Sequence, residues 1–229
     1  MRLVVLDTET TGLEVSQGHR IVEVAAVELV DRRLTGRHFH RYINPQRPVD
    51  EGALRVHGLD EAFLADKPLF AEIAADLAEF VAGARLIIHN APFDTGFLAA
   101  EFERVGQPDD SLLADVLDTL AMARELHPGK RNSLDALCER YGVDNSGRTL
   151  HGALLDAELL AEVYLAMTRG QESLITFLAD EEAAGLATGD SGLQALALRV
   201  LRASEQEIAA HDAVLAGMAD KSPPLWSQA

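Results

Sequence analysis

The sequence is poor in cysteine and in long apolar runs, and both absences exclude classes of protein. Its single cysteine, Cys138, cannot form a disulfide within the chain, and its apolar helical surroundings favour a small core residue over a reactive thiol. No run of about 18 apolar residues occurs, which argues against a membrane-spanning helix. The N-terminal segment reaches Asp7 after four apolar residues, too few for the apolar core of a signal peptide. We therefore expect a cytoplasmic protein.

Basic residues are also scarce: 20 Lys and Arg stand against 37 Asp and Glu, for a formal net charge of −17. This balance argues against a protein that coats duplex DNA with a broad basic face, because such binding neutralises many phosphates. A nuclease with a small local site remains compatible with it, since divalent cations held by carboxylates supply positive charge.

The 229 residues, 48% of them hydrophobic, are enough for one α/β domain with a tail or for two small domains. Short β-branched or apolar runs predict strands at residues 3–6, 21–30, 34–43 and 86–88. Apolar residues at helical spacing predict helices at residues 69–82, 92–104, 118–126, 133–141 and 152–168. Three strands precede the alternation of helices and strands, so we expect an α/β fold whose mixed sheet is flanked by helices.

The organisation changes near residue 170. Residues 170–192 combine glycines with acidic residues, helical periodicity returns at 193–218, and a Pro-Pro pair near the C-terminus prevents regular structure. We therefore expect a domain at 1–169 and a tethered helical or flexible tail at 170–229.

Two carboxylates stand at the end of the first predicted strand. Asp7 and Glu9 are two residues apart, so their side chains point to the same side of the strand. Carboxylates placed together repel each other unless a cation lies between them, and oxygen-rich sites of this kind suit Mg²⁺ or Mn²⁺. For an isolated Asp-x-Glu the commoner alternative is a helix cap or a solvated pair.

Further acidic residues begin two of the predicted helices. Asp94 lies on the opening turn of the helix at 92–104, and Asp156 lies near the start of the helix at 152–168. His151 is five positions before Asp156, about 140° around a helix axis, so the two are not stacked on one face and His151 could equally lie on the entering loop. Spacing alone does not bring these residues together.

Three short motifs carry a resemblance to a known family. The motifs are Asp7-Thr-Glu-Thr-Thr-Gly12, Asn90-x-x-Phe93-Asp94 and His151-x-x-x-x-Asp156. In this order they resemble the three motifs of the DEDDh exonucleases. Over roughly residues 1–170 the sequence is similar to the proofreading subunits of bacterial replicative DNA polymerases. This resemblance implies a ribonuclease-H-like mixed sheet flanked by helices.

The resemblance also implies a mechanism. Asp7, Glu9, Asp94 and Asp156 would hold two divalent metal ions, Mg²⁺ or Mn²⁺, for phosphodiester hydrolysis. His151 would be the general base, a role that the ordinary histidine pKa of about 6.5 suits. A tyrosine at this place would mark the sister DEDDy group. Without the motif, a structural histidine would be the preferred interpretation of His151.

Substrate contacts follow from the same resemblance. It implies a pocket for the terminal nucleotide lined by Thr10, Leu13, His57, Asn90 and Phe93. For His57, a polar loop residue before a glycine turn is an equal alternative. Lys130, Arg131 and Arg148 are candidates for phosphate contact, and a solvated loop explains them equally well.

The tail suggests protein partners. Gln171–Phe177 resembles peptides that dock on the bacterial sliding clamp, although one residue is inserted and an ordinary helix start is the alternative. The resemblance implies that the segment from about 190 to 229, with its exposed Leu225-Trp226, binds the catalytic subunit of DNA polymerase III, and a small accessory subunit is a further candidate partner.

The function expected from the sequence is 3′→5′ hydrolysis of single-stranded or frayed 3′ DNA ends to mononucleotides, for proofreading. Two alternatives remain at this point: an exonuclease of the same family in RNA processing or DNA repair, and a non-catalytic ribonuclease-H-like binding module. The four acids and His151 are all present, which disfavours the binding module.

Overall fold

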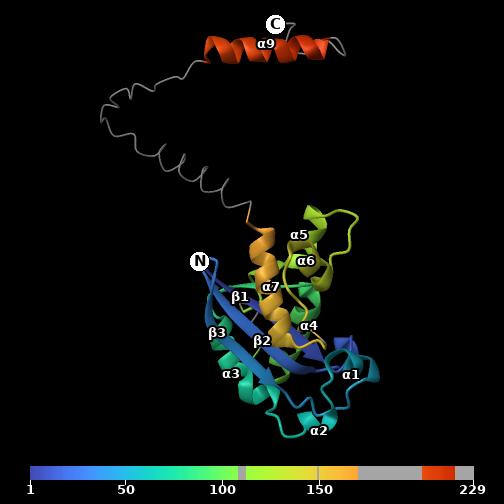
Figure 1. The fold of residues 1–229 in the computed structure, drawn as a ribbon. Coiled ribbons are helices and arrows are strands. Elements are labelled where there is room, and N and C mark those ends of the chain that lie inside the picture. Colours follow the sequence, from blue (N-terminus) through green and yellow to red (C-terminus); the bar gives the residue numbers. More distant parts are fainter. Residues whose placement is uncertain (108–111, 149, 170–202, 220–229) are drawn as a thin grey trace, which may run out of the picture. The chain divides into compact units, whose positions relative to one another are not determined.

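The computed structural model describes residues 1–107, 112–148, 150–169 and 203–219. A five-stranded sheet with the order β3-β2-β1-β4-β5 forms its centre (Figure 1). The strands are β1 (Arg2–Thr10), β2 (Ile21–Val30), β3 (Arg33–Tyr42), β4 (Arg85–Ile88) and β5 (Val116–Asp118). β1, β2 and β3 pair antiparallel, whereas β4 is parallel to β1 and to β5. The predicted mixed sheet is thus confirmed.

Each of the five predicted helices is present, with ends within a residue or two of the expected ones. They are α3 (Phe70–Val81), α4 (Ala91–Arg104), α5 (Thr119–Leu126), α6 (Leu134–Tyr141) and α7 (Ala153–Met167). Three short helices were not expected from the sequence: η1 (Val15–Gln17), α1 (Glu51–His57) and α2 (Glu61–Leu64). They are too short to show a helical repeat of apolar residues.

β1 is buried on both faces of the sheet, and its alternate residues belong to two separate cores. Val4 and Leu6 pack with apolar residues of α3 and α4, whereas Leu3 and Val5 pack with those of α6 and α7. Figure 1 shows α7 lying across the strands on its side of the sheet. A strand covered on both faces reads as a continuous apolar run, as residues 3–6 do.

The carboxyl ends of the parallel strands meet at one edge of the sheet. β1 ends there at Thr10, β4 leads through Asn90 into α4, and β5 ends at Asp118. Asn90 takes the left-handed conformation (φ +66°), which turns the chain sharply into the helix. Ligands bind at such edges in open α/β sheets.

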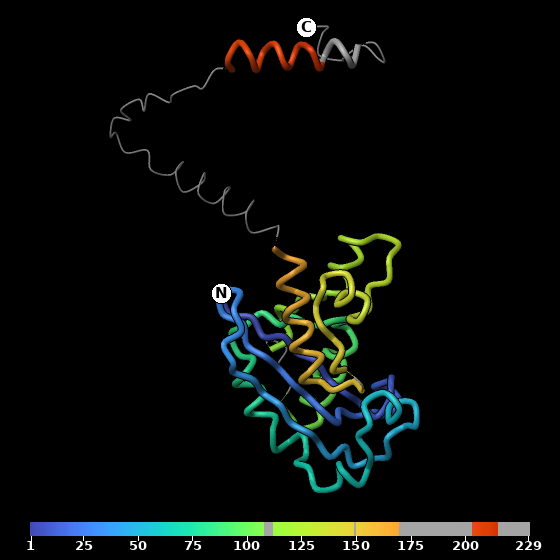
Figure 2. The backbone as a smooth tube through the Cα atoms, viewed as in Figure 1, coloured from blue at the N-terminus to red at the C-terminus, as the bar shows by residue number. Residues whose placement is uncertain are grey.

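The segment that leads into α7 is fastened to the region around α1. Figure 2 shows the yellow segment before α7 beside the blue and cyan segments that follow β1. The backbone N–H of His151 donates to the carbonyl of Val56 at 3.0 Å. The region at the end of β1 is therefore bounded by chain segments far apart in sequence.

The chain divides into two compact units, Met1–Asp180 and Glu181–Ala229. In the second unit the structure describes α9 (Glu205–Ala219), which begins after Ser204, whose N–H and O–H both reach the Glu207 carboxylate at 2.8 Å. The segment Gln171–Phe177 and the pair Leu225-Trp226 lie outside the described residues. Among the helices that the structure describes, none has the length and apolar character needed to cross a membrane.

Candidate active site

The last residues of β1 direct polar groups to both sides of the sheet. Asp7 and Glu9 continue the alternation of Leu3 and Val5, the residues that pack with α7. Thr8 points the other way, toward α4. Its N–H and O–H donate to Oδ1 of Asp94 at 3.1 and 2.7 Å. Asp94 is buried in the first turn of α4, and Thr8 fixes the orientation of its carboxylate.

Asp156 enters the site from the first turn of α7, where its side chain is buried. His151 lies on the loop before this helix, since α7 begins at Ala153, and this decides between the two locations that the sequence left open. Nδ1 of His151 is 3.4 Å from Oδ2 of Asp156, and its side chain is 45% exposed, which leaves one side of the ring open to solvent.

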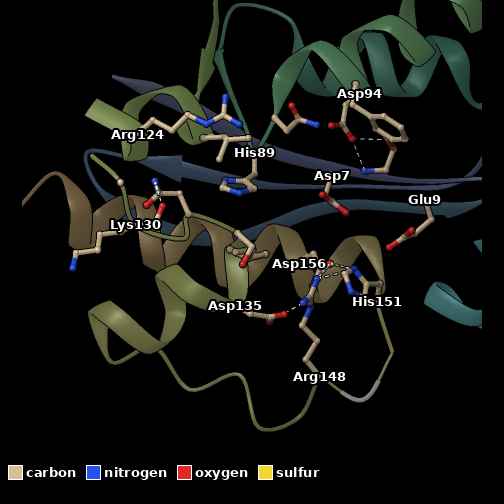
Figure 3. Close-up of a pocket in the computed structure, with 18 residues that line it drawn as sticks. Asp7, Glu9, His89, Asp94, Arg124, Lys130, Asp135, Arg148, His151 and Asp156 are labelled. Carbon is tan, nitrogen blue, oxygen red and sulfur yellow. Dashed lines mark hydrogen bonds and ion pairs between the residues drawn. The ribbon is translucent and has the colours of Figure 1, made fainter. Parts of the chain in front are cut away.

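The five residues singled out by the motifs line one cleft of about 640 Å³. Figure 3 shows the Asp7 side chain between Asp94 and Asp156, with Glu9 and His151 to one side. Ligand atoms of Glu9, His151 and Asp156 lie within 4.8 Å of one another, close enough for one metal ion to bind all three. Residues from β1, α4, the loop before α7 and α7 itself thus meet in one place.

Ionisation is disfavoured at three of these carboxylates. Burial, and then the neighbouring Asp94, Glu9 and Asp156, raise the pKa of Asp7 well above its ordinary value. Burial first, and then Asp156 and Glu23, raise the pKa of Glu9 to about 8. Burial raises the pKa of Asp94 to about 7, although the hydrogen bonds from Thr8 act in the opposite direction. A cation in the cleft would relieve this repulsion.

The donor set fits a divalent cation. Asp7 and Glu9 have no hydrogen bond or ion pair from their carboxylates within the described part of the chain. Asp7 is partly exposed to the cleft and Glu9 is 9% exposed, and carboxylates enclosed to this degree are costly unless they are neutralised or bind a cation. Carboxylate oxygens with one imidazole suit hard divalent ions, Mg²⁺ and Mn²⁺ among them.

A second, more apolar pocket of about 410 Å³ adjoins the cleft. Four of the predicted substrate-binding residues line it, namely Thr10, Leu13, His57 and Phe93. The fifth, Asn90, lines the carboxylate cleft instead, and Glu9 and Phe93 line both cavities. The two cavities therefore adjoin, and Glu9 and Phe93 lie at the boundary between them.

Gly12 and His57, which both line the second pocket, are each fixed by a close neighbour. A Cβ on Gly12 would overlap the imidazole ring of His19, which explains the glycine that ends the first motif. Both ring nitrogens of the buried His57 are engaged: Nδ1 accepts from the N–H of Leu59 at 3.0 Å, and Nε2 lies 3.3 Å from the carbonyl oxygen of Thr10. His57 therefore offers its ring surface to the pocket.

Thr8 and Arg148 have surroundings in this site that the sequence did not reveal. Thr8 could have been found from strand alternation, but its partner Asp94 lies 86 positions away. Arg148 was expected in phosphate contact or in a solvated loop, yet its side chain is only 7% exposed and binds Asp156 and Asp135. Arg148 and Asp135 are not at a spacing typical of any regular element, so their contact could not be predicted from the sequence.

The end of the cleft away from Glu9 is basic. Arg124 and Lys130 line it and supply the positive charge (Figure 3). His89 also lines it, but burial lowers its pKa and so favours the neutral ring. Of the basic loop residues considered from the sequence, Lys130 lies on this cleft, whereas Arg131 lines a separate shallow cavity with Lys130 and Arg140.

Comparisons with known sequences agree with this architecture. The profile of a family described as "Exonuclease" matches residues 4–164. DNA polymerase III subunit epsilon of Escherichia coli K12 is 52% identical over 223 residues, which cover 93% of this chain and 92% of that protein. The subunit of the same name from Rickettsia prowazekii is 55% identical over 175 residues, 76% of each chain.

Solved structures show the same fold. Exonuclease X in complex with 5′ overhanging duplex DNA superposes with a TM-score of 0.57 at 27% identity, covering 73% of this chain and 92% of that one. Escherichia coli exonuclease I in complex with a dT13 oligonucleotide gives a TM-score of 0.67 over 77% of this chain and 43% of that one. Its identity of 19% supports the fold alone. The chain belongs to the exonuclease family, as a 3′→5′ exonuclease related to the DNA polymerase III epsilon subunits.

Proposed function

We propose that this exonuclease hydrolyses single-stranded or frayed 3′ DNA ends to mononucleotides, as the proofreading subunit of a replicative DNA polymerase. The observation that carries the proposal is the convergence of Asp7, Glu9, Asp94, Asp156 and His151 on a cleft that opens into an apolar pocket. One cavity has the ligands for phosphodiester chemistry, and the other has room for a base and sugar.

In this proposal the four carboxylates are the ligands of two divalent ions, Mg²⁺ or Mn²⁺. Such ions supply the positive charge that stabilises the attacking and leaving oxygens of phosphodiester hydrolysis. The raised pKa values of Asp7 and Glu9 and their lack of partners in the described chain support this assignment.

The protein's own residues orient the reaction. Thr8 holds Oδ1 of Asp94, which leaves Oδ2 directed to the cleft. His151 takes the proton of the attacking water through a ring nitrogen, and its half-open ring gives a water molecule access to it. His151→Gln is expected to lower kcat by about 10²- to 10⁴-fold, the usual contribution of a general base.

The apolar pocket is the proposed site of the terminal nucleotide. Phe93 offers an aromatic face for stacking, and Leu13, 78% exposed, is free to pack against the last base. A mispaired 3′ end unpairs more readily than a matched one, so a pocket that accepts only single strand favours mispaired ends. Equal hydrolysis of paired and mispaired ends by the isolated chain would contradict this explanation.

The basic end of the cleft is the proposed path of the remaining strand. Arg124 and Lys130 supply local positive charge in a chain whose net charge is −17. Lys130→Ala should raise KM for an oligonucleotide and reduce the dependence of KM on salt, because one phosphate contact is lost.

The proposed partners are a DNA polymerase III catalytic subunit, bound through about 190–229, and a sliding clamp, bound through Gln171–Phe177. Such a role belongs to the cytoplasm of a bacterial cell. The relatedness to subunits named DNA polymerase III epsilon over 93% of the chain supports the polymerase partner. A small accessory subunit is a further candidate. Pull-down of the polymerase subunit by the full chain and by a chain ending at residue 177 tests the assignment of the tail, and equal binding by both rejects it.

The activity is tested with a 5′-labelled single-stranded DNA oligonucleotide and its RNA counterpart, in Mg²⁺, Mn²⁺ or EDTA. We expect DNA to shorten from its 3′ end by one nucleotide at a time, with mononucleotide release abolished by EDTA and by Asp7→Ala. Preferred attack on RNA would favour an RNA-processing role. No hydrolysis with any metal would favour the binding module.

A further inference from the structure

Arg148 occupies an unusual place in the candidate site. Its side chain is 7% exposed, and its guanidinium forms a two-point pair with Asp156: Nε lies 2.5 Å from Oδ1 and Nη2 lies 2.6 Å from Oδ2. Both carboxylate oxygens of a proposed metal ligand are therefore engaged by a cation of the chain itself. Figure 3 shows Arg148 reaching into the carboxylate cluster from the loop before α7.

The same guanidinium also engages the proposed base. Nη2 of Arg148 lies 2.8 Å from Nδ1 of His151. Arginine only donates, so Nδ1 must accept, and the proton of a neutral imidazole then resides on Nε2. In this arrangement neither ring nitrogen is free to accept a proton from water.

Asp135 holds Arg148 from the other side. Its Oδ1 accepts from Nη1 of Arg148 at 2.7 Å and from the side-chain amide of Asn145 at 3.0 Å. Asp135 lies on α6 and Asn145 on the loop that carries Arg148, so these bonds fasten that loop to a helix outside the carboxylate cluster.

We propose that Arg148 is a positioning residue that neutralises Asp156 when no metal is bound, and that it leaves Asp156 and His151 together when a divalent ion binds. One movement then frees a metal ligand and unmasks the base, so that both become available at the same step. This inference rests on the proposed function, in which Asp156 is a metal ligand and His151 the base.

If Arg148 and the metal ion compete for Asp156, removing the Arg148 side chain should raise the affinity for the metal. A ligand whose binding-competent state is populated only in part has an affinity reduced by that fraction. If the pair with Asp156 is closed about nine-tenths of the time, Arg148→Ala binds Mn²⁺ about tenfold more tightly than the unmodified chain. A residue that only supported the fold would leave the affinity unchanged or weaken it.

The test is calorimetric titration of the full chain with Mn²⁺ in the absence of DNA, with thermal unfolding in EDTA and in Mn²⁺. Arg148→Ala should bind Mn²⁺ more tightly, unfold at a lower temperature in EDTA, and gain more from Mn²⁺ than the unmodified chain does. Arg85→Ala is the matched control, because it breaks another arginine–carboxylate pair, with Asp115 at 2.7 Å, at the opposite end of β4. It should leave the Mn²⁺ affinity unchanged.

A second variant, Asp135→Asn, and ¹⁵N spectra of His151 test the same proposal independently. Asp135→Asn loosens Arg148 without changing a proposed ligand, so it should raise the Mn²⁺ affinity in the same direction and serves if Arg148→Ala does not fold. In ¹⁵N spectra with Mg²⁺, the Nδ1 signal of His151 should move on metal binding in the unmodified chain and should already be moved in Arg148→Ala.

The possible outcomes distinguish the role of Arg148 from the metal site itself. Mn²⁺ binding that depends on Asp7, with unchanged or weaker affinity in both Arg148→Ala and Asp135→Asn, overturns the role of Arg148 alone. Absence of Mn²⁺ binding by the unmodified chain overturns the proposed metal site and the role of Arg148 with it.

Discussion

Two pairs of carboxylates in this protein, one buried within the fold and one lining the cleft, differ in what neutralises them. Glu28 on β2 and Glu101 on α4 are each held by arginines: Glu28 by Arg2 at 2.7 Å, and Glu101 by Arg20 at 2.5 and 2.6 Å. Asp7 and Glu9, in the cleft, have no such partner in the described residues.

The difference appears in their ionisation. The hydrogen bond from Arg2 lowers the pKa of Glu28, whereas burial and neighbouring acids raise the pKa of Glu9 to about 8. A buried acid with its own arginine remains charged at neutral pH, whereas Glu9, without one, is favoured in its charged form at that pH only when a cation binds. Ion pairing thus distinguishes Glu28 and Glu101 from Asp7 and Glu9, whereas Asp156 combines an arginine partner with a place in the cleft.

The largest effect is expected at Asp7. Asp7→Asn should lower the rate of hydrolysis by about 10³-fold or more, because metal ions contribute several kcal/mol of charge stabilisation. The same change should raise the unfolding temperature in EDTA, since it removes repulsion among the acids of the cleft. Activity assays and thermal unfolding measure the two effects. Asp115→Asn, on the surface just before β5, is the control and should change neither. A lower unfolding temperature for Asp7→Asn would show instead that the Asp7 carboxylate stabilises the fold.

The converse is expected at Glu101. Glu101→Gln should destabilise the protein by about 3 kcal/mol, because it leaves the guanidinium of Arg20 without its buried partner. Urea unfolding measures the loss, and the activity of the folded fraction should be unchanged. An activity loss as large as that of Asp7→Asn would remove the distinction between the two groups.

A smaller effect is expected where Thr8 orients Asp94. Thr8→Val keeps the N–H bond and removes the O–H bond of 2.7 Å, so metal affinity should fall by about tenfold, as for other groups that orient metal ligands. Calorimetry with Mn²⁺ measures the change. Thr95→Val is the matched control, because the Thr95 hydroxyl donates to the carbonyl of Ala91 within its own helix. Equal losses in the two variants would exclude a specific role for Thr8.

The smallest effect is the pH dependence of Glu28. Its pKa is lowered from 4.5 in the folded state, so its charged form stabilises the fold above pH 4.5, and this contribution is lost as pH falls through the lowered pKa. Glu28→Gln should therefore destabilise the protein by about 1–2 kcal/mol at pH 7 and by less near pH 3.5. Urea unfolding at both values measures this, and a difference independent of pH would show that packing, not charge, is lost.

Much of the fold was readable because its signals are local. The β-branched run at 21–30 forms β2 with the predicted bounds, and Asp31 and Arg32 adopt the left-handed conformation of a tight hairpin turn. Helix α4 begins at Ala91, one residue before the predicted start, with Pro92 in its first turn. The short helices α1 and α2 carry too few turns to give a repeat, so the segment that borders the second pocket was not predicted.

The sequence by itself determined which reactive groups are available, namely the four acids and His151, and its continuous apolar run determined that β1 is buried on both faces. Only the tertiary structure decided which groups meet, since the Thr8–Asp94 contact spans 86 positions and depends on how β1 and α4 pack. It also decided that Arg148, which the sequence offered as a phosphate ligand or a solvated residue, lies against Asp156 and His151. The physical reason is that residue type and periodicity act locally, whereas the neutralisation of a buried charge depends on which side chain the completed fold brings within a few ångströms of it.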